Sequence, residues 1–416
     1  MTGRTHTLGQ RASFWVAAAV VAHTIWTSAA PAMTYPLYAS EWGLNTTQTA
    51  TIFAIYPIVV VAILICFGNV SDYIGRRTTM LLGLGASLIG VLLFAVAPSL
   101  GWVYIGRAFM GIGVGLSAGP STAAVIEFSA PGQAKKASAI TTVAQAVGLA
   151  LATLIGGALI QYAPFPTRLN FWLLLAIIML IFIATWFLPR HNGNGGAGRW
   201  RPRSPSVPPG LGNVVLAAVA AVVSAYAIGT VGLSLGAQIA RDLIGSGNVL
   251  LNGATMSVFA IVLGAVGLLC KSMTSRASIA VGGICTVVGM AFLTASVALH
   301  SLLIFLGFLV AAGCGYSLLF MGGLGLINTY APTHNRGGTL STVYLVAYLV
   351  QGGLALLLGA LATGWGLARA IDLGAIAIVS LCIITGAIAL LITVPHPCHL
   401  AVRCNKEQSL APVRRL

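Results

Sequence analysis

Charged side chains, and acidic ones above all, are nearly missing from this chain. Six of its 416 residues are Asp or Glu, and charged residues of either sign make up 6% of the total. An ordinary soluble domain carries about 25%. Hydrophobic residues make up 58%, and the mean hydropathy is +0.97. Because so few polar side chains cannot cover a water-soluble fold, most of its surface is expected to face lipid.

Motifs of the common enzyme classes are missing as well. The seven cysteines form no C-x-x-C spacing, and most of them lie in apolar runs, where they are expected to pack as small hydrophobic residues. No phosphate-binding loop, nucleophile elbow or metal-ligand spacing is found in the sequence. We therefore expect no enzyme, no cofactor, no metal site and no drive by ATP binding to this chain.

Long apolar runs follow one another instead. A helix that crosses a hydrocarbon core of about 30 Å needs roughly 20 residues. The alternating segments of about ten residues that make a membrane β-barrel are not found. The predicted fold is an all-α membrane protein with twelve transmembrane helices. These spans are predicted near 13–38, 46–69, 78–98, 102–128, 138–163, 169–189, 213–240, 248–271, 277–299, 301–330, 339–364 and 370–394.

The net charge is +15, and the basic residues are distributed along the chain as the predicted topology requires. If the N-terminus is cytoplasmic, all but four of the 21 Lys and Arg residues fall in cytoplasmic segments. Basic residues are retained on that side during insertion, and they can contact lipid headgroups. We expect both termini in the cytoplasm, a bacterial inner-membrane location and no nucleic-acid partner. The four exceptions are Arg107, Arg168, Arg241 and Arg369.

The chain divides into two similar halves. "LNTTQTATIFAI" (44–55) resembles "LNGATMSVFAI" (251–261), and "EFSAPGQAKKASAITT" (127–142) resembles "NTYAPTHNRGGTLSTV" (328–343). A six-span repeat keeps its sidedness, so we predict parallel copies with a substrate site between them, as in transporters. The first apolar run is expected to be a span, not a cleaved leader, because the repeat requires it. The predicted units are an N-terminal six-helix bundle at 1–189, a Gly-, Pro- and Arg-rich cytoplasmic linker at 190–212, a C-terminal six-helix bundle at 213–396 and a cytoplasmic tail at 397–416.

The loop "GNVSDYIGRR" (68–77) joins predicted spans 2 and 3. It resembles the signature G-x-x-x-D-[RK]-x-G-R-[RK] of the major facilitator superfamily, which has this loop in the same place. The matching residues are Gly68, Asp72, Gly75, Arg76 and Arg77. Tyr73 departs from the signature, because a basic residue is usual there. The resemblance implies a twelve-span transporter in which an acid at the position of Glu127 pairs with an arginine of this loop.

This loop carries the first predicted site. Gly68 lets another helix approach closely, and Gly75 permits a tight turn. Asp72 can accept hydrogen bonds from the N-terminus of a helix in the other half. We expect an Asp72–arginine–Glu127 cluster to latch the two halves on the cytoplasmic side of the outward-open state. The alternative is an ordinary insertion-directing loop, whose surface charges contribute under about 1 kcal/mol.

Two ionisable residues inside spans are candidates for proton coupling. Arg107, in "GRAFMGIGVG" (106–115), resembles part of a span-4 motif that is implicated in proton transfer in proton-coupled exporters of the superfamily. Its alternatives are snorkelling to the membrane interface and a structural hydrogen bond. His23, roughly 15 Å deep in span 1, can titrate near neutral pH. Its alternative is a hydrogen-bonding core residue.

Span 5 departs from the exporters of the superfamily. They typically carry G-x-x-x-G-P-x-x-G-G there, whereas "GLALATLIGG" (148–157) has Ala152 and Thr153 in place of Gly-Pro. The proline kink is therefore missing, which keeps uptake open as an alternative to export.

The resemblance places spans 1, 4, 7 and 10 around a substrate cavity. Three of the candidates, Tyr344, Tyr348 and Gln351, share one helix face. The alternative role is hydrogen bonding between helices or anchoring at the interface. A cavity of aromatic, amide and hydroxyl groups suits a neutral or anionic amphipathic molecule. The full set of cavity candidates is Trp26, Thr27, Tyr35, Gln145, Tyr226, Gln238, Tyr316, Tyr344, Tyr348 and Gln351.

Together these features predict a monomeric secondary transporter that works by alternating access. Its expected activity is proton-coupled efflux of a drug or metabolite, with membrane lipids as neighbours. A proton-coupled uptake symporter is the first alternative. A non-transporting membrane sensor built on the same scaffold is the second.

Overall fold

The computed structural model of the chain describes residues 7–130, 134–189, 207, 210–243, 245, 247–331 and 336–391. The part so described is helical and contains no strand. Twelve of its helical segments are long and apolar enough to cross a membrane. This confirms the prediction of an all-α protein with twelve spans.

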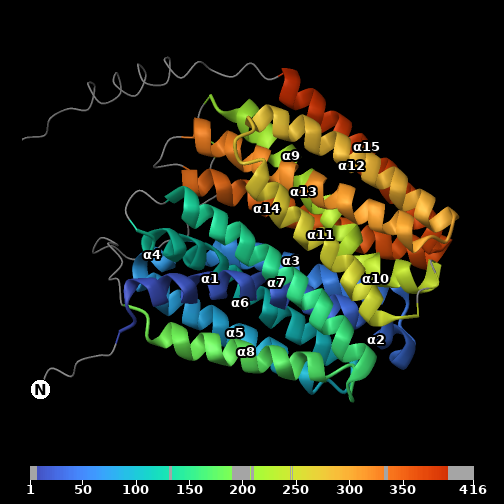
Figure 1. The fold of residues 1–416 in the computed structure, drawn as a ribbon, viewed down its shortest axis with the longest axis horizontal. Helices are drawn as coiled ribbons and strands as arrows, with labels where there is room; N and C mark the ends of the chain where they lie inside the picture. The colour runs from blue at the N-terminus through green and yellow to red at the C-terminus, as the bar shows by residue number, and fades with distance from the viewer. Residues whose placement is uncertain are drawn as a thin grey trace, which may run out of the picture.

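The first half of the chain holds six of these spans (Figure 1). Asn45 caps the second of them, because its side chain accepts from the Gln48 amide while the Gln48 side chain accepts from the Asn45 amide. A short helix, α4 (Ser71–Ile74), lies in the loop that follows. The spans are α1 (Gln10–Ala29) continued by η1 (Ala30–Met33) and α2 (Tyr35–Trp42), α3 (Thr46–Phe67), α5 (Arg76–Ala95), α6 (Leu100–Glu127), α7 (Ala134–Tyr162) and α8 (Leu169–Trp186).

The second half holds the other six. Its first span is interrupted by two π-helical segments, η2 and η3, where widened turns replace regular α-helix. The spans are α9 (Gly212–Thr230) continued by η2 (Val231–Leu235), α10 (Gly236–Gln238) and η3 (Ile239–Leu243), α11 (Val249–Leu269), α12 (Ser275–Ala298), α13 (Leu302–Tyr330), α14 (Arg336–Trp365) and α15 (Leu367–Leu391).

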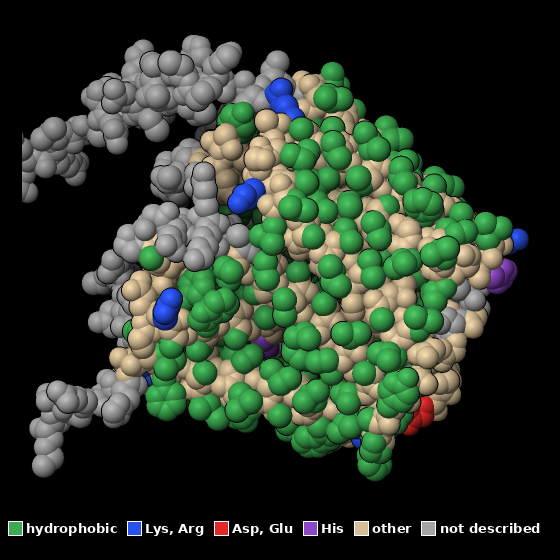
Figure 2. All heavy atoms as spheres, viewed as in Figure 1, with side chains coloured by type: hydrophobic (Ala, Val, Ile, Leu, Met, Phe, Trp, Pro, Cys, Tyr) green, Lys and Arg blue, Asp and Glu red, His purple; other side chains and the backbone are tan. Residues whose placement is uncertain are grey.

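Hydrophobic side chains cover most of the face in Figure 2, and Lys and Arg lie toward its edges. Large apolar side chains that would be costly in water stand exposed along the spans, such as Leu180 at 68% and Ile284 at 64% exposure. This surface fits a lipid environment. We call the end where α8 finishes and α9 starts the linker end, and the opposite end, with α2 and η3, the far end.

The packing of the first half recurs in the second. A Cβ atom added at Gly113 of α6 would lie 2.7 Å from the Gly83 carbonyl oxygen of α5. One added at Gly315 of α13 would lie 3.1 Å from the Gly282 carbonyl oxygen of α12. In both places the absence of a side chain lets two helices approach closely. The halves therefore share a packing motif as well as sequence. They meet chiefly through two helix pairs, α3 with α14 and α7 with α11.

Candidate functional site

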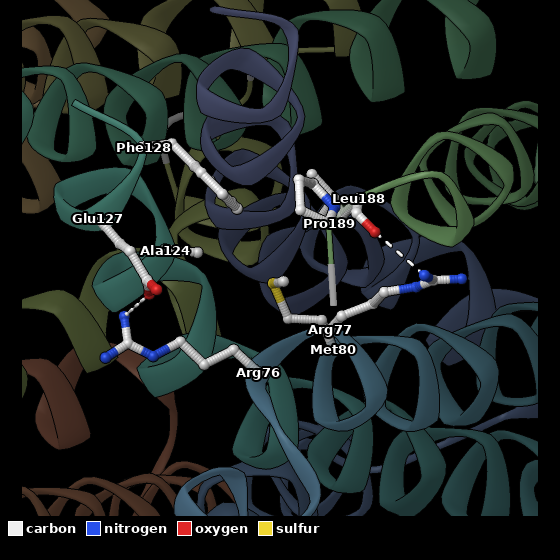
Figure 3. A pocket seen from close by; sticks show the side chains of 8 residues that line it. All are labelled: Arg76, Arg77, Met80, Ala124, Glu127, Phe128, Leu188 and Pro189. Carbon is white, nitrogen blue, oxygen red and sulfur yellow. Dashed lines mark hydrogen bonds and ion pairs between the residues drawn. The ribbon is translucent and has the colours of Figure 1, made fainter. Parts of the chain in front are cut away.

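An ion pair occupies the linker end of the first half (Figure 3). Arg76 begins α5 and Glu127 ends α6, so the two helices bring them together. The Arg76 Nη1 atom lies 2.6 Å from Glu127 Oε2, and the two side chains are 38% and 29% exposed. This is a short charge-assisted bond, but because both side chains are partly exposed its contribution to stability is under about 1 kcal/mol. Both partners belong to the first half, so this pair by itself does not join the halves.

Arg77 points to another partner. Its Nη1 donates to the Leu188 carbonyl at 3.0 Å (Figure 3). Its guanidinium lies 5.8 Å from the Trp186 ring centroid. These contacts tie the start of α5 to the end of α8, where the chain leaves the first half.

The loop motif contains two glycines besides these arginines. Gly75 joins α4 to α5 with φ +84°, a conformation that strongly favours glycine. Gly68 is exposed, and the atoms nearest to an added Cβ belong to Leu64 of its own helix. The side chain of Asp72 lies outside the described residues, so its part in the predicted cluster stays a prediction.

His23 links two helices of the first half. Its Nε2 atom lies 3.0 Å from Ser87 Oγ of α5, and its Nδ1 lies 3.1 Å from the Val20 carbonyl oxygen. The ring is 2% exposed. Both ring nitrogens thus have hydrogen-bond partners, as expected if His23 is a hydrogen-bonding residue of the core.

Arg107 is fully buried, at 0% exposure, and so does not snorkel. Its Nε donates to the Ile52 carbonyl of α3 at 3.2 Å, and Nη1 donates to the Thr27 carbonyl of α1 at 3.4 Å. The guanidinium lies 4.7 Å from the centroid of the Tyr56 ring. A cation over an aromatic face is stabilised by the ring quadrupole. Sequence reasoning missed Tyr56, because nothing in the sequence of span 2 marks which aromatic residue meets a cation of span 4.

Four of the predicted cavity tyrosines gather in one cluster in the second half. Tyr226 of α9 stacks on Tyr316 of α13 at 6.1 Å and meets Tyr348 of α14 edge-on at 5.1 Å. Tyr344 joins through Phe320, at 6.3 Å between ring centroids. Phe320 and Phe259 also belong to the cluster, although they were not predicted. We call these six residues the aromatic cluster.

Tyr56 connects the two regions. It lies under Arg107 in the first half, and the residue after it, Pro57, lies beside Gly352 of α14, four residues from Tyr348, since a Cβ added at Gly352 would be 3.5 Å from Pro57 Cγ. The corner around Arg107 is therefore a neighbour of the aromatic cluster.

The remaining cavity candidates separate into two groups. Trp26, Thr27 and Tyr35 are buried in the first half, and their side-chain polar atoms have no hydrogen-bond partner in the described structure. The others are amides. Gln145 and Gln351 are half-buried, and Gln351 Oε1 has no partner within that same part of the chain. Gln238 Nε2 lies 3.5 Å from Thr46 Oγ1, which is a contact between the halves.

Further bonds between the halves lie at the far end and were not predicted. Arg241 of η3 donates from Nη1 to the Pro36 carbonyl of α2 at 2.9 Å. The hydroxyl oxygens of Thr47 on α3 and Thr363 on α14 lie 2.8 Å apart. These contacts depend on how the halves are placed against each other, which no sequence pattern within one half specifies.

The α7–α11 pair is bonded along its length. The backbone N–H of Val249 donates to Gln161 Oε1 at 2.8 Å near the far end. Deeper in, Thr153 Oγ1 and Ser257 Oγ lie 2.9 Å apart. Thr153 thus replaces the exporter proline by a hydroxyl that bonds to the other half.

Comparisons with known proteins agree with this architecture. A family model described as Major Facilitator Superfamily matches residues 15–352. The multidrug efflux pump LfrA of Mycolicibacterium smegmatis is 31% identical over 154 residues, 36% of this chain and 30% of that protein. The puromycin resistance protein pur8 of Streptomyces alboniger is 26% identical over 166 residues, 39% of this chain and 32% of that protein. The chain thus spans about a third of the length of these curated relatives.

Solved structures share the fold. A peptide transporter crystallised with sulfate superposes with a TM-score of 0.73 at 16% identity, over 94% of this chain and 96% of the other. A bacterial homologue of the human lysosomal transporter Spinster, in an inward-facing conformation, gives a TM-score of 0.68 at 15% identity, over 92% and 96% of the two chains. Both family and fold are those of membrane transporters, which are not enzymes.

Proposed function

Because this chain belongs to the Major Facilitator Superfamily, we propose that it is a proton-coupled exporter of a small organic molecule, working by alternating access. The observation that carries the proposal is the aromatic cluster on four helices of the second half, with Tyr56 and Arg107 of the first half beside it. Such a surface suits an amphipathic molecule with an aromatic or apolar body.

Export is favoured by the kind of relative that the chain resembles. Two of them are named as an efflux pump and a resistance protein. Proton coupling would use His23 or Arg107, since no acid lies in the cluster described above. The His23 ring is held by Ser87, and a proton on Nε2 could be donated to that same hydroxyl oxygen.

The Arg76–Glu127 pair supports a conformational latch at the linker end. In this proposal Asp72 joins the pair and reaches the second half when the far end is open. The linker end then faces the cytoplasm, both termini are cytoplasmic, and the protein acts as a monomer in the inner membrane. The proposed units remain 1–189, 190–212, 213–396 and 397–416.

Uptake of a small metabolite with protons is the second candidate. It is favoured by one observation: Thr153 stands where exporters carry proline, and its hydroxyl bonds to Ser257 of the second half. A span held straight in this way need not move as the kinked span of an exporter does.

Transport by the purified full-length protein in liposomes with an imposed pH gradient tests the proposal. Aromatic carboxylates, amides and amines are offered in turn, and an entrapped dye reports internal pH. For an exporter inserted inside-out, we expect inward substrate flux coupled to loss of luminal protons. Flux of substrate and protons in the same direction would favour uptake, and no flux with any compound would overturn both.

A further inference from the structure

The buried guanidinium of Arg107 has more donors than the structure satisfies. An arginine carries five N–H donors and no acceptor. Two of them are used, by the carbonyls of Ile52 and Thr27. Nη1 also lies 3.9 Å from the Met110 sulfur, a weak acceptor. Nη2 has no hydrogen-bond partner in the described part of the chain, and the whole residue is 0% exposed.

The charge of Arg107 also lacks a counter-ion. No described carboxylate forms an ion pair with it, since Glu127 is held by Arg76 at the linker end and Glu41 and Asp372 are exposed. Two carbonyl dipoles and the face of Tyr56 stabilise the cation only in part. An isolated buried charge is costly unless an anion or further hydrogen bonds compensate for it.

Two hydroxyl groups near this guanidinium are unpartnered as well. Thr27 presents its carbonyl to Arg107, and its Oγ1 has no partner among the described residues. Tyr35 is 3% exposed, its hydroxyl likewise finds no partner there, and it lies within electrostatic range of Arg107. One region of the first half therefore contains a cation and two hydroxyl groups without hydrogen-bond partners, and no described carboxylate accepts hydrogen bonds from them.

The geometry points to an anion subsite: Arg107, Thr27 and Tyr35 bind the carboxylate of the transported molecule. A carboxylate offers about four acceptor positions and pairs well with a guanidinium. Tyr56 lies under Arg107 and near Tyr316 and Tyr348, so the aromatic cluster is next to the anion subsite. The apolar body of such a molecule would bind against that cluster. The inference rests on the proposed function and narrows its substrate class to aromatic monocarboxylates.

The subsite lies beside a contact between the halves. Tyr35 is followed by Pro36, whose carbonyl accepts from Arg241 of the second half. Opening of the far end breaks this bond and moves the backbone next to Tyr35. Occupancy of the anion subsite is thereby linked to which end of the bundle is closed.

A matched pair of probes tests the subsite: 2-naphthoate and its neutral analogue 2-naphthamide. Binding to the detergent-purified full-length protein is measured by thermal shift and by quenching of tryptophan fluorescence. We expect 2-naphthoate to bind at least tenfold more tightly than 2-naphthamide. Arg107→Gln should abolish this preference, and Tyr35→Phe and Thr27→Val should each reduce it about tenfold or more, the effect of one hydrogen bond to a charged group.

The control is Thr385→Val, which removes a buried hydroxyl that bonds to Ser224 in the second half. It should leave the preference unchanged.

If Arg107→Gln does not fold, Tyr35→Phe and Thr27→Val still decide the matter, because each removes little more than one polar group. Equal affinity for the two probes, or a preference that survives in Tyr35→Phe and Thr27→Val, would overturn the subsite and leave Arg107 with a structural water only. Transport of neutral compounds without preference for carboxylates would also overturn the subsite, but it would leave the transporter proposal standing. Binding of 2-naphthoate without transport of any compound would overturn the transporter proposal and leave the anion-binding site standing.

Discussion

The two ends of the bundle are held by different kinds of bond. At the linker end, a half-exposed ion pair joins Arg76 to Glu127 inside the first half. At the far end, Arg241 donates to the Pro36 carbonyl, and threonine hydroxyls meet between α3 and α14, so the bonds cross from one half to the other. Among the bonds of the described residues named here, the one at the linker end thus stiffens a single unit, whereas those at the far end fasten two units together.

This difference matters if the halves move against each other, as proposed above. A bond inside one half can persist through a transport cycle, but each bond between the halves must break once per cycle. Hydrogen bonds of the far-end kind contribute about 0.5–1.5 kcal/mol each, and about 1.5–3 when one partner is charged. A few of them close the far end firmly enough to form a defined state, yet weakly enough to reopen.

The largest expected effect comes from preventing α7 and α11 from packing closely where the halves meet. A Cβ atom at Gly253 of α11 would collide with the Thr153 carbonyl and lie 3.2 Å from the Gly157 Cα. Gly253→Val should therefore separate α11 from α7 and destabilise the fold by about 1–3 kcal/mol or more. The measurement is the midpoint of thermal unfolding in detergent. Gly353→Val is the matched control, because a Cβ there meets nothing within 4 Å. Similar midpoints for both variants would contradict the close approach.

A substitution at the linker end should have the opposite profile: it should lower the transport rate and leave the stability of the fold nearly unchanged. Glu127→Gln removes an exposed ion pair worth under about 1 kcal/mol, so the unfolding midpoint should hardly change. If the pair belongs to a latch, transport should fall at least tenfold, and Asp72→Asn should do the same. The measurement is flux in liposomes at equal protein content. Full transport in both variants would show that these are ordinary surface charges.

The same contrast explains which features of the structure could be predicted from the sequence. The twelve spans follow from apolar length alone, and the structure places them within a few residues of the predicted ranges. Glu127 could be paired in advance with an arginine of the loop, because the loop motif and the end of span 4 mark both places, and the structure shows that the arginine is Arg76. The contacts of Arg241 and Thr363 could not, because they depend on the placement of one half against the other. Tyr56 was missed for a similar reason, since the rotation of α3 about its axis decides which ring faces Arg107.

Weakening the far end should shift the balance of conformations. Arg241→Gln loses the charge-assisted bond to Pro36, and at about 1.5 kcal/mol this changes the ratio of closed to open far ends roughly tenfold. Spin labels at the exposed positions Glu41 and Arg369, in a background without native cysteines, would report the distance across the far end. We expect a longer-distance population to grow in Arg241→Gln and to stay at the original level in Arg168→Gln, an exposed arginine in the loop before α8. An unchanged distribution would mean that the Pro36 bond does not help close the far end.

The smallest effect is expected midway along α7, where Thr153 and Ser257 share a hydrogen bond of 2.9 Å. Each hydroxyl also has a carbonyl of its own helix within hydrogen-bond distance, Leu149 at 3.3 Å for Thr153 and Gly253 at 2.8 Å for Ser257, so the hydroxyl that remains can donate there when the other is removed. Thr153→Val and Ser257→Ala should each cost about 1 kcal/mol or less. The double variant should cost less than the two single costs added, by the value of the shared bond. A double-variant cycle on unfolding midpoints and flux measures that coupling. Strict additivity would mean that the halves do not interact through this pair, and the departure from the exporter motif at Thr153 would then have no consequence at the interface.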